Sequence, residues 1–355
     1  MKKLVLLMAM VLAGCASAPS ATTSSAIALA NLDALIEQGA GDPASVDLLL
    51  LRAQLLADDT VFDRAITLTD AASTAPELLR RARARAGVHR FADALADLEA
   101  AEQAGAKVDA QRASLWLAMG RASEALPMLQ AEANRRPGFA THAALARGLA
   151  AAGRLDEADG FYAQALAELD TTSPFPAASL WFARGMMWAE QGGNAARGRR
   201  MYAEALRLVP EFVVANIHMA ELEAEAGEVA AAIARLQRVV DQATEPEALA
   251  LLGALHVNAG ETQRGRDEIG AARRRFDALL ARHPRAYADH AAEFFLGAGG
   301  DAERARFWAR LNLAERGTRR AHQLAIRAAE AAGRPDEAMA LRARMHERFP
   351  NEKAA

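Results

Sequence analysis

The sequence contains one cysteine, Cys15, in 355 residues, so no disulfide can form within the chain. Lysine is also scarce, since only four of the 42 basic residues are lysine and the rest are arginine. The basic residues are intermixed with 45 acidic residues along the chain. Because nucleic-acid binding depends on cations clustered against phosphates, this pattern argues against a nucleic-acid partner.

Catalytic motifs are missing as well. The chain has no H-E-x-x-H, no G-x-S-x-G, no phosphate-binding glycine loop and no cluster of cysteine and histidine. Its eight histidines are scattered, and no two have the i, i+4 spacing of one helix face. We therefore expect no catalytic site, no metal and no cofactor. An enzyme remains an alternative that clustered histidines or carboxylates in the folded groove would support.

Strand signals are absent from Ile27 onward. Alternation of apolar and polar residues never persists, and alanine, leucine, glutamate and arginine dominate. The sequence therefore predicts an all-α protein.

The first 14 residues have the layout of a secretory signal peptide. Lys2 and Lys3 precede an apolar run, residues 4–13, which is short of the about 20 residues that span a bilayer. The run ends in the tetrapeptide LAGC, which resembles the bacterial lipobox. The resemblance implies that residues 1–14 are cleaved and that Cys15 carries the lipid.

Two other outcomes remain open for this segment. Residues 16–18, ASA, form a cleavage site of their own, and cleavage after Ala18 would release a soluble exported protein. An uncleaved segment would leave the chain anchored or in the cytoplasm. If Cys15 is lipidated, Ala16 in place of aspartate resembles the Gram-negative sorting signal for the outer membrane, with the protein facing the periplasm. Residues 15–26 are small and polar, which predicts a flexible tether before a capping helix at 27–43.

One unit repeats along residues 44–355. Residues 193–212 align without a gap with residues 120–139, and both stretches share a glycine, a small residue five positions later and a proline seventeen positions later. In the first two copies Thr60 and His89 replace the glycine. The small residues recur at spacings of 29 to 40; they are Ala65, Ala94, Ala125, Ala158, Gly198, Ala232, Gly265, Ala305 and Ala338.

This spacing resembles the tetratricopeptide repeat, whose period is about 34 residues. The resemblance implies a right-handed α-solenoid of about eight to nine helix pairs. In each pair the glycine allows a left-handed turn between the helices, the small residue lets them approach closely, and the proline ends the second helix. HEAT-like pairs, with periods of about 40–47 residues, are a weaker match.

Two steps of 40 residues depart from the period. Within residues 166–181, Pro174 and Pro176 predict an enlarged loop. Residues 272–284 stay helical in pattern, which predicts a lengthened second helix.

The resemblance implies a concave surface of first helices that binds segments of other proteins. Mapped by register, the groove residues are Arg147, Arg184, Met187, Glu221, Tyr287, His290, Phe294 and Arg327. Tyr287, Phe294 and Arg184 are the predicted anchors, because aromatic and arginine side chains dominate interface energies. Core packing or a solvated face is the alternative for each of them. The family's carboxylate clamp is absent, since Lys107 is followed four positions later by Gln111 and no other lysine lies within residues 44–350.

The combined prediction is a lipid-anchored envelope protein that serves as a scaffold for other envelope proteins or peptides, in an assembly, secretion, pilus or cell-wall machine. A glycan-binding protein is the weaker alternative. It needs several exposed aromatic side chains, whereas the repeat register places Trp116 and Trp188, two of the four tryptophans, in packing seams.

Overall fold

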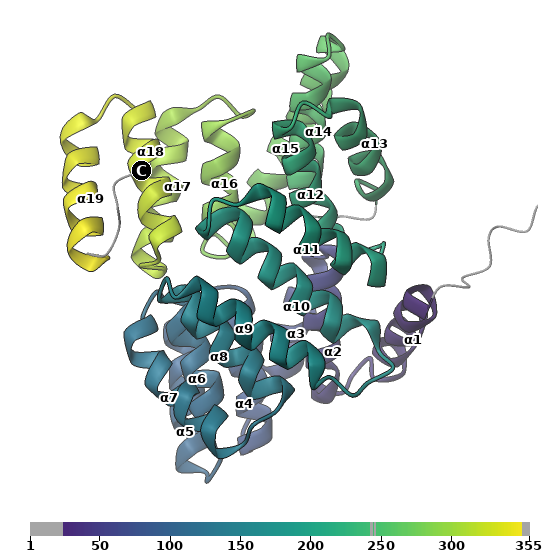
Figure 1. The fold of residues 1–355 in the computed structure, drawn as a ribbon, viewed down its shortest axis with the longest axis vertical. Helices are drawn as coiled ribbons and strands as arrows, with labels where there is room; N and C mark the ends of the chain where they lie inside the picture. Colours follow the sequence, from purple (N-terminus) through teal and green to yellow (C-terminus); the bar gives the residue numbers. More distant parts are fainter. Residues whose placement is uncertain (1–23, 242–243, 245, 350–355) are drawn as a thin grey trace, which may run out of the picture.

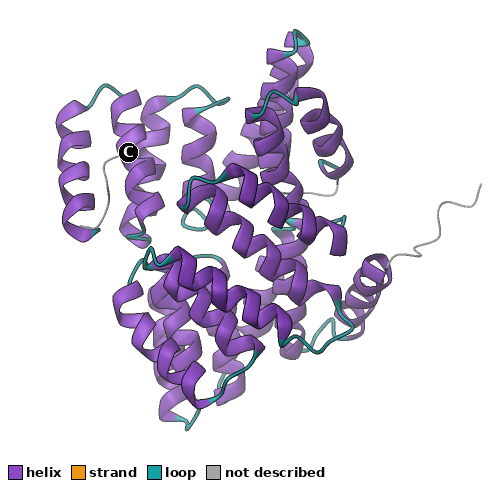
Figure 2. Ribbon diagram, in the orientation of Figure 1, coloured by secondary structure: helices purple, strands orange, loops and turns teal. Residues whose placement is uncertain are grey.

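The computed structural model describes residues 24–241, 244 and 246–349, so Cys15 and the predicted signal peptide lie outside the described residues. Every regular element among these residues is helical (Figure 2). Helix α1 (Ser24–Gln38) comes first. It begins within the predicted tether and ends five residues before position 43, where the capping helix was expected to end.

Nine helix pairs follow α1 within the described residues, which confirms the predicted all-α architecture of tetratricopeptide-like pairs. The first helices are α2 (Val46–Leu56), α4 (Ala75–Gly87), α6 (Asp109–Ala118), α8 (Phe139–Ala151), α10 (Pro174–Met186), α12 (Val213–Glu225), α14 (Glu247–Asn258), α16 (Ala288–Leu296) and α18 (Arg319–Ala331). The second helices are α3 (Thr60–Thr69), α5 (Phe91–Gln103), α7 (Ala122–Arg135), α9 (Leu155–Ala167), α11 (Ala195–Leu208), α13 (Val229–Val239), α15 (Thr262–Arg282), α17 (Ala302–Glu315) and α19 (Pro335–Arg348). A 3₁₀ turn, η1 (Pro43–Ser45), precedes α2, and a π-helical turn, η2 (Met187–Gln191), extends α10.

The small residue of each repeat lies where the register predicts. All nine are buried in second helices, at the seam with their first helices. At Gly265 the approach is so close that an added Cβ would lie 2.4 Å from the carbonyl oxygen of Gly253. Close approach of the two helices therefore depends on small residues at this position.

The turn between the two helices of a pair has a left-handed residue, as predicted. In seven turns it is glycine with positive φ: Gly120, Gly153, Gly193, Gly227, Gly260, Gly300 and Gly333. In the first two turns Ala57 (φ 50°) and His89 (φ 55°) adopt this conformation. The left-handed residue of the first turn is thus three positions before Thr60, where the sequence alignment placed the glycine equivalent. A left-handed backbone costs a residue with a Cβ about 1–2 kcal/mol.

The two long repeats differ in their origin. Helix α15 has 21 residues, which confirms the lengthened second helix. The enlarged loop expected within residues 166–181 is limited to residues 168–173, because Pro174 and Pro176 lie in the first turn of α10. Proline is compatible with a helix start, where its missing N–H leaves no hydrogen bond unmade. The remaining extra residues extend the first helix through η2.

The solenoid is wound so tightly that its N-terminal helices pack against later repeats. Side chains of α1, α2 and α3 share a hydrophobic core with α10, α11 and α12. Figure 1 shows α2 and α3 behind α10 and α11. Phe62 and Ile66 of α3 also pack against the core of α15 and α16. Since α10, α12 and α16 are first helices, the first pair occupies part of the solenoid's own inner face.

A second contact closes the ring between the third and ninth pairs. The Gly317 N–H donates to the carbonyl oxygen of Met119 at 3.1 Å, and Arg348 donates to the carbonyl oxygen of Gly120 at 3.1 Å. A Cβ added at Gly120 would lie 2.4 Å from the oxygen of Gly317. The two turns therefore meet backbone to backbone, and only a glycine at position 120 permits that approach.

Candidate interaction site

Charged side chains from the later repeats converge on the inner face of the solenoid. Arg320 of α18 donates to Glu190 of η2 at 3.0 Å, which links the fifth and ninth pairs. Both residues lie on a first helix or on its direct extension, and first helices line the concave face of such a superhelix. We call the whole set the inner polar cluster; it consists of Glu190, His218, Glu221, Glu247, Asp289, His290, Arg316 and Arg320.

Each histidine of the inner polar cluster contacts carboxylates. His218 Nδ1 lies 2.9 Å from Glu221 and 3.8 Å from Glu190. His290 Nδ1 bonds to Glu247, and its Nε2 lies 3.6 Å from Asp289. Asp289 is also bonded to Arg316 at 2.9 Å. These pairs join α12 to η2, α14 to α16, and α16 to the end of α17.

The pKa values in this cluster reflect the competition between burial and these partners. Burial would raise the pKa of Asp289, but His290 and Arg316 lower it to about 2. Burial likewise opposes the charged form of His218, but the bond to Glu221 raises its pKa above the usual value. Glu247 has a lowered pKa because His290 outweighs the effect of burial. The cluster therefore favours carboxylates in the ionised form.

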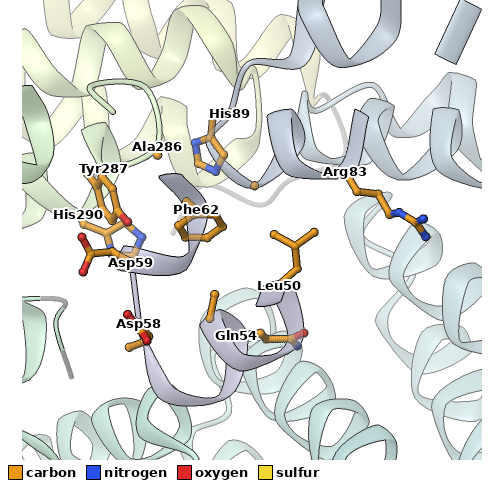
Figure 3. A pocket seen from close by; sticks show the side chains of 13 residues that line it. Leu50, Gln54, Asp58, Asp59, Phe62, Arg83, His89, Ala286, Tyr287 and His290 are labelled. Atoms are coloured by element: carbon orange, nitrogen blue, oxygen red, sulfur yellow. The ribbon is translucent and has the colours of Figure 1, made fainter. Parts of the chain in front are cut away.

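A cavity of about 320 Å³ lies next to this cluster, between the first two pairs and α16. Its walls include Leu50, Phe62, His89, Tyr287 and His290. In Figure 3, His89, Tyr287 and His290 lie along one side and Leu50 along the other, with Phe62 between them. We call it the junction cavity, because its walls come from segments about 200 residues apart in the sequence.

Two carboxylates of the junction cavity are neutralised by arginines. Asp59 is bonded to Arg282 at 2.7 Å, and Asp58 is bonded to Arg52. Asp63, just outside the cavity, is bonded to Arg282 and His283, both at 2.7 Å. The pairs with Arg282 and His283 also join α3 to the end of α15 and hold the cavity walls together.

A second cavity of about 420 Å³ lies beside the contact that closes the ring. Gly120, Arg121, Arg319 and Arg348 are among its lining residues. Arg121 is bonded to Glu124 in the same lining, so part of the positive charge is compensated.

The predicted groove residues lie in different environments. Arg147, Glu221 and Arg327 are exposed, and Arg184 and His290 are half-buried. Glu221 and His290 belong to the inner polar cluster, and Arg327 is bonded to Glu293 beside it. Partner contact remains a prediction for these residues.

Two of the three predicted anchors are core residues. Tyr287 is 4% exposed and Phe294 is 5% exposed, and the Phe294 ring lies 4.8 Å from that of Phe276. Neither offers a partner a large exposed surface, because both belong to the core that α16 shares with α15, α17 and α18.

The third predicted anchor, Arg184, is engaged within the chain. It donates to Asp159 on α9 at 2.6 Å and 2.7 Å, and Asp159 also accepts from Trp188 at 2.6 Å. Met187, another predicted groove residue, is 1% exposed and packs in the core of the fourth and fifth pairs. Both belong to the seam between neighbouring pairs rather than to an open groove.

Tyr287 and His290 of the junction cavity were predicted as groove residues, but the cavity residues of the first two repeats were not. Leu50, Phe62 and His89 belong to the first two repeats, where the motif is weakest. The available signal was the missing glycine at position 89, which singles out one turn of the solenoid. The meeting of these residues with α16 had no local signal.

The inner polar cluster brings histidines and carboxylates together, the grouping that the sequence analysis gave as support for an enzyme. No set of three histidine, cysteine, aspartate or glutamate side chains in the described part of the chain is placed to hold a metal ion. Among the described helices, none combines the length and hydropathy that a membrane span requires.

No protein-family model matches the chain, and no curated protein matches it in sequence. Solved structures share its helix arrangement at low identity. A chain of the APC/C hetero-tetramer Cut9–Hcn1 is 16% identical with a TM-score of 0.49, over 87% of this chain and 61% of that chain. This protein thus spans less than two thirds of that relative's length.

Two further structures are similar at the same level. Human IFIT1, solved as a dimer with PPP-AAAA, is 12% identical with a TM-score of 0.47, over 92% of this chain and 91% of IFIT1. PilF of Pseudomonas aeruginosa is 18% identical with a TM-score of 0.38, over 69% of this chain and 92% of PilF. At these values the likeness carries no inference about partners.

Proposed function

We propose that this protein is a lipid-anchored scaffold of a bacterial cell envelope, which binds a segment of a partner protein on the inner face of its solenoid. The lipid is on Cys15, and the domain faces the periplasm from the outer membrane. The observation that carries the binding function is the inner polar cluster together with the adjoining junction cavity.

The membrane attachment is supported by the tetrapeptide LAGC, which ends at Cys15. Burial of acyl chains stabilises attachment by about 0.8 kcal/mol per methylene, and stable anchoring takes more than one chain, as a lipobox cysteine carries. Nine residue steps separate Cys15 from Ser24, where α1 begins. At full extension they reach about 30 Å, so the anchor keeps the domain close to the lipid surface.

The binding function is supported by charged side chains that keep solvent access on the inner face. The side chains of Glu221 and Arg320 are 47% and 51% exposed although each has an ionic partner. Superhelices of helix pairs use their concave surface for extended protein segments. Charges that alternate in sign favour a polar partner segment with complementary charges, because such pairs determine orientation and exclude wrong partners.

The test is affinity capture of the tagged full chain from membranes, with mass spectrometry of its amino terminus and of the proteins that co-purify. We expect an acylated Cys15 at the mature terminus and an envelope partner. Cys15→Ala should lose the acyl group and the outer-membrane location. An unmodified terminus that begins at Pro19, directly after Ala18, would contradict the lipid anchor.

A pair of charge variants tests where the partner binds. Arg320→Ala removes an inner-face charge, whereas Arg207→Ala removes an exposed charge of the second helix α11, where Arg207 is bonded only locally to Glu204. We expect the first variant to lose the partner and the second to retain it. Equal capture by the two variants would exclude the inner face as the binding surface.

A further inference from the structure

The two turns without glycine meet at one place. Ala57 and His89 are the left-handed residues of the first two turns, and both line the junction cavity. Seven other turns use glycine for the same backbone conformation. Side chains held in this conformation are strained and tend to cluster at functional sites. At Ala57 the side chain adds only a methyl group, whereas at His89 it adds a hydrogen-bonding ring.

The ring of His89 is held in one orientation. Its Nδ1 lies 3.0 Å from the carbonyl oxygen of Arg285, and the ring stacks on Phe91 with a centroid separation of 5.2 Å. Burial, followed by the positive charge of Arg316, lowers the pKa of His89 to about 4, so the ring is neutral at pH 7. Because a carbonyl oxygen only accepts, Nδ1 carries the proton and Nε2 is the acceptor. No described residue hydrogen-bonds to Nε2.

Apart from the amide of Gln54, the rest of the cavity wall is apolar or carries charges that are paired, as Arg83 is with Asp47. Leu50 and Phe62 present hydrocarbon surface, and Asp59 is paired with Arg282. A volume of about 320 Å³ is at the small end of the range for ligand pockets, about 300–1,000 Å³, and suits one large side chain better than an extended peptide. A neutral ring with one unused acceptor favours a guest that is apolar over most of its surface and has a single donor.

We propose that the junction cavity receives an aromatic side chain that carries an N–H or O–H donor, a tryptophan or tyrosine of the partner segment, and that His89 Nε2 accepts its hydrogen bond. This inference rests on the proposed function, since the side chain belongs to a partner protein. The guest contacts α2 and α3 on one side and the start of α16 on the other, and so it bridges the first and eighth pairs.

The test uses the full chain, purified as the cell processes it, and labelled at the histidine rings for NMR. The probes are N-acetyltryptophanamide and its phenylalanine analogue, which lacks the side-chain donor. We expect a saturable shift of the His89 ring signal with the tryptophan probe and about three- to tenfold weaker binding of the phenylalanine probe. No saturable shift, or equal affinity for the two probes, would overturn the inference.

Two variants assign the effect to His89. His89→Gly gives this turn the residue of the seven other turns and removes the ring, and we expect it to bind both probes equally and weakly. Ala57→Gly relieves the same backbone strain without loss of a ring, and it should keep the preference for tryptophan. If His89→Gly keeps that preference, His89 is not the acceptor. Should His89→Gly fail to fold, the difference in affinity between the two probes on the wild-type chain still tests the inference.

The outcome is separable from the proposed function. A partner captured from membranes by a chain that shows no probe preference would overturn this inference and leave the scaffold function standing. Probe preference without any captured partner would support the chemistry of the cavity and count against the scaffold function.

Discussion

Closure of the ring can be tested by one methyl group at Gly120. Replacement by alanine has two costs. The first is a left-handed backbone (φ 77°) in a residue with a Cβ, about 1–2 kcal/mol. The second is separation of the two turns, because the Cβ would lie 2.4 Å from the oxygen of Gly317. Separation breaks the bonds from Gly317 to Met119 and from Arg348 to Gly120, each worth about 0.5–1.5 kcal/mol. Together these costs should lower the free energy of unfolding by about 2–5 kcal/mol.

Gly227→Ala is the matched control. Gly227 has nearly the same backbone (φ 80°), but nothing lies within 4 Å of an added Cβ, so this variant has the backbone cost alone. The assay is hydrogen exchange at the Gly317 amide, whose acceptor is 198 positions away in the sequence. The Gly120 variant should lose about 1–3 kcal/mol of protection there, and the Gly227 variant should keep it. Equal protection in the two variants would refute the closed ring.

Three further perturbations follow from packing and charge. Gly265→Ala should lower the free energy of unfolding by about 1–3 kcal/mol, because the added methyl group overpacks the seam between the two helices. Gly270→Ala in the same helix should raise it by about 0.5–1 kcal/mol, because only a flexible arginine lies near the added Cβ, at 3.6 Å. Urea unfolding measures both changes. Arg184→Ala removes the two hydrogen bonds that Arg184 donates to Asp159. It should lower the free energy of unfolding by about 1–3 kcal/mol in the same assay. The pKa of His89 is lower in the folded chain than in the unfolded chain, so the unfolded chain binds a proton at this ring first as the pH falls. The free energy of unfolding of the wild type should therefore decrease by up to about 3 kcal/mol relative to that of His89→Asn between pH 6.5 and 4. A pH-independent difference would contradict the burial of His89.

The repeat architecture was predictable because it is local. A glycine turn, a small residue at the seam and the length of a helix each depend on residues within one pair. The nine buried small positions and the 21-residue α15 therefore follow from spacing alone. The turn at Ala57 shows the limit of this reasoning, because alignment by the small residue placed the left-handed position at Thr60.

Three of the predicted groove residues, Met187, Tyr287 and Phe294, are buried in the structure. Met187 is the first residue of the π-helical turn η2 and packs in the core between neighbouring pairs. Tyr287 lies at the N-cap of α16, before the helix face begins. Phe294 is on that face, but its ring packs in the core against Phe276 and Phe295. The repeat spacing in the sequence predicts neither the π-helical turn at Met187 nor the N-cap position of Tyr287.

Ring closure was beyond the sequence for a different reason. The curvature of a solenoid is the sum of small rotations between neighbouring pairs, so a slight change in each decides whether distant pairs touch. Nothing near Gly120 in the sequence indicates that Gly317 will lie against it. The inner polar cluster has the same origin, because Glu190 and Arg320 are 130 positions apart.

Closure and occupancy of the junction cavity are linked, and the link is reciprocal. A side chain that contacts both walls binds the closed ring more tightly than an opened one, so it must favour closure by the same factor by which closure favours binding. Gly120→Ala opens the ring at the third and ninth pairs without touching a cavity residue. If the solenoid closes as one unit, this variant weakens the tryptophan probe while Gly227→Ala does not. If the probe binds both variants equally, the junction of the first and eighth pairs is rigid by itself, and the bonds from Asp59 and Asp63 to Arg282 suffice to hold it.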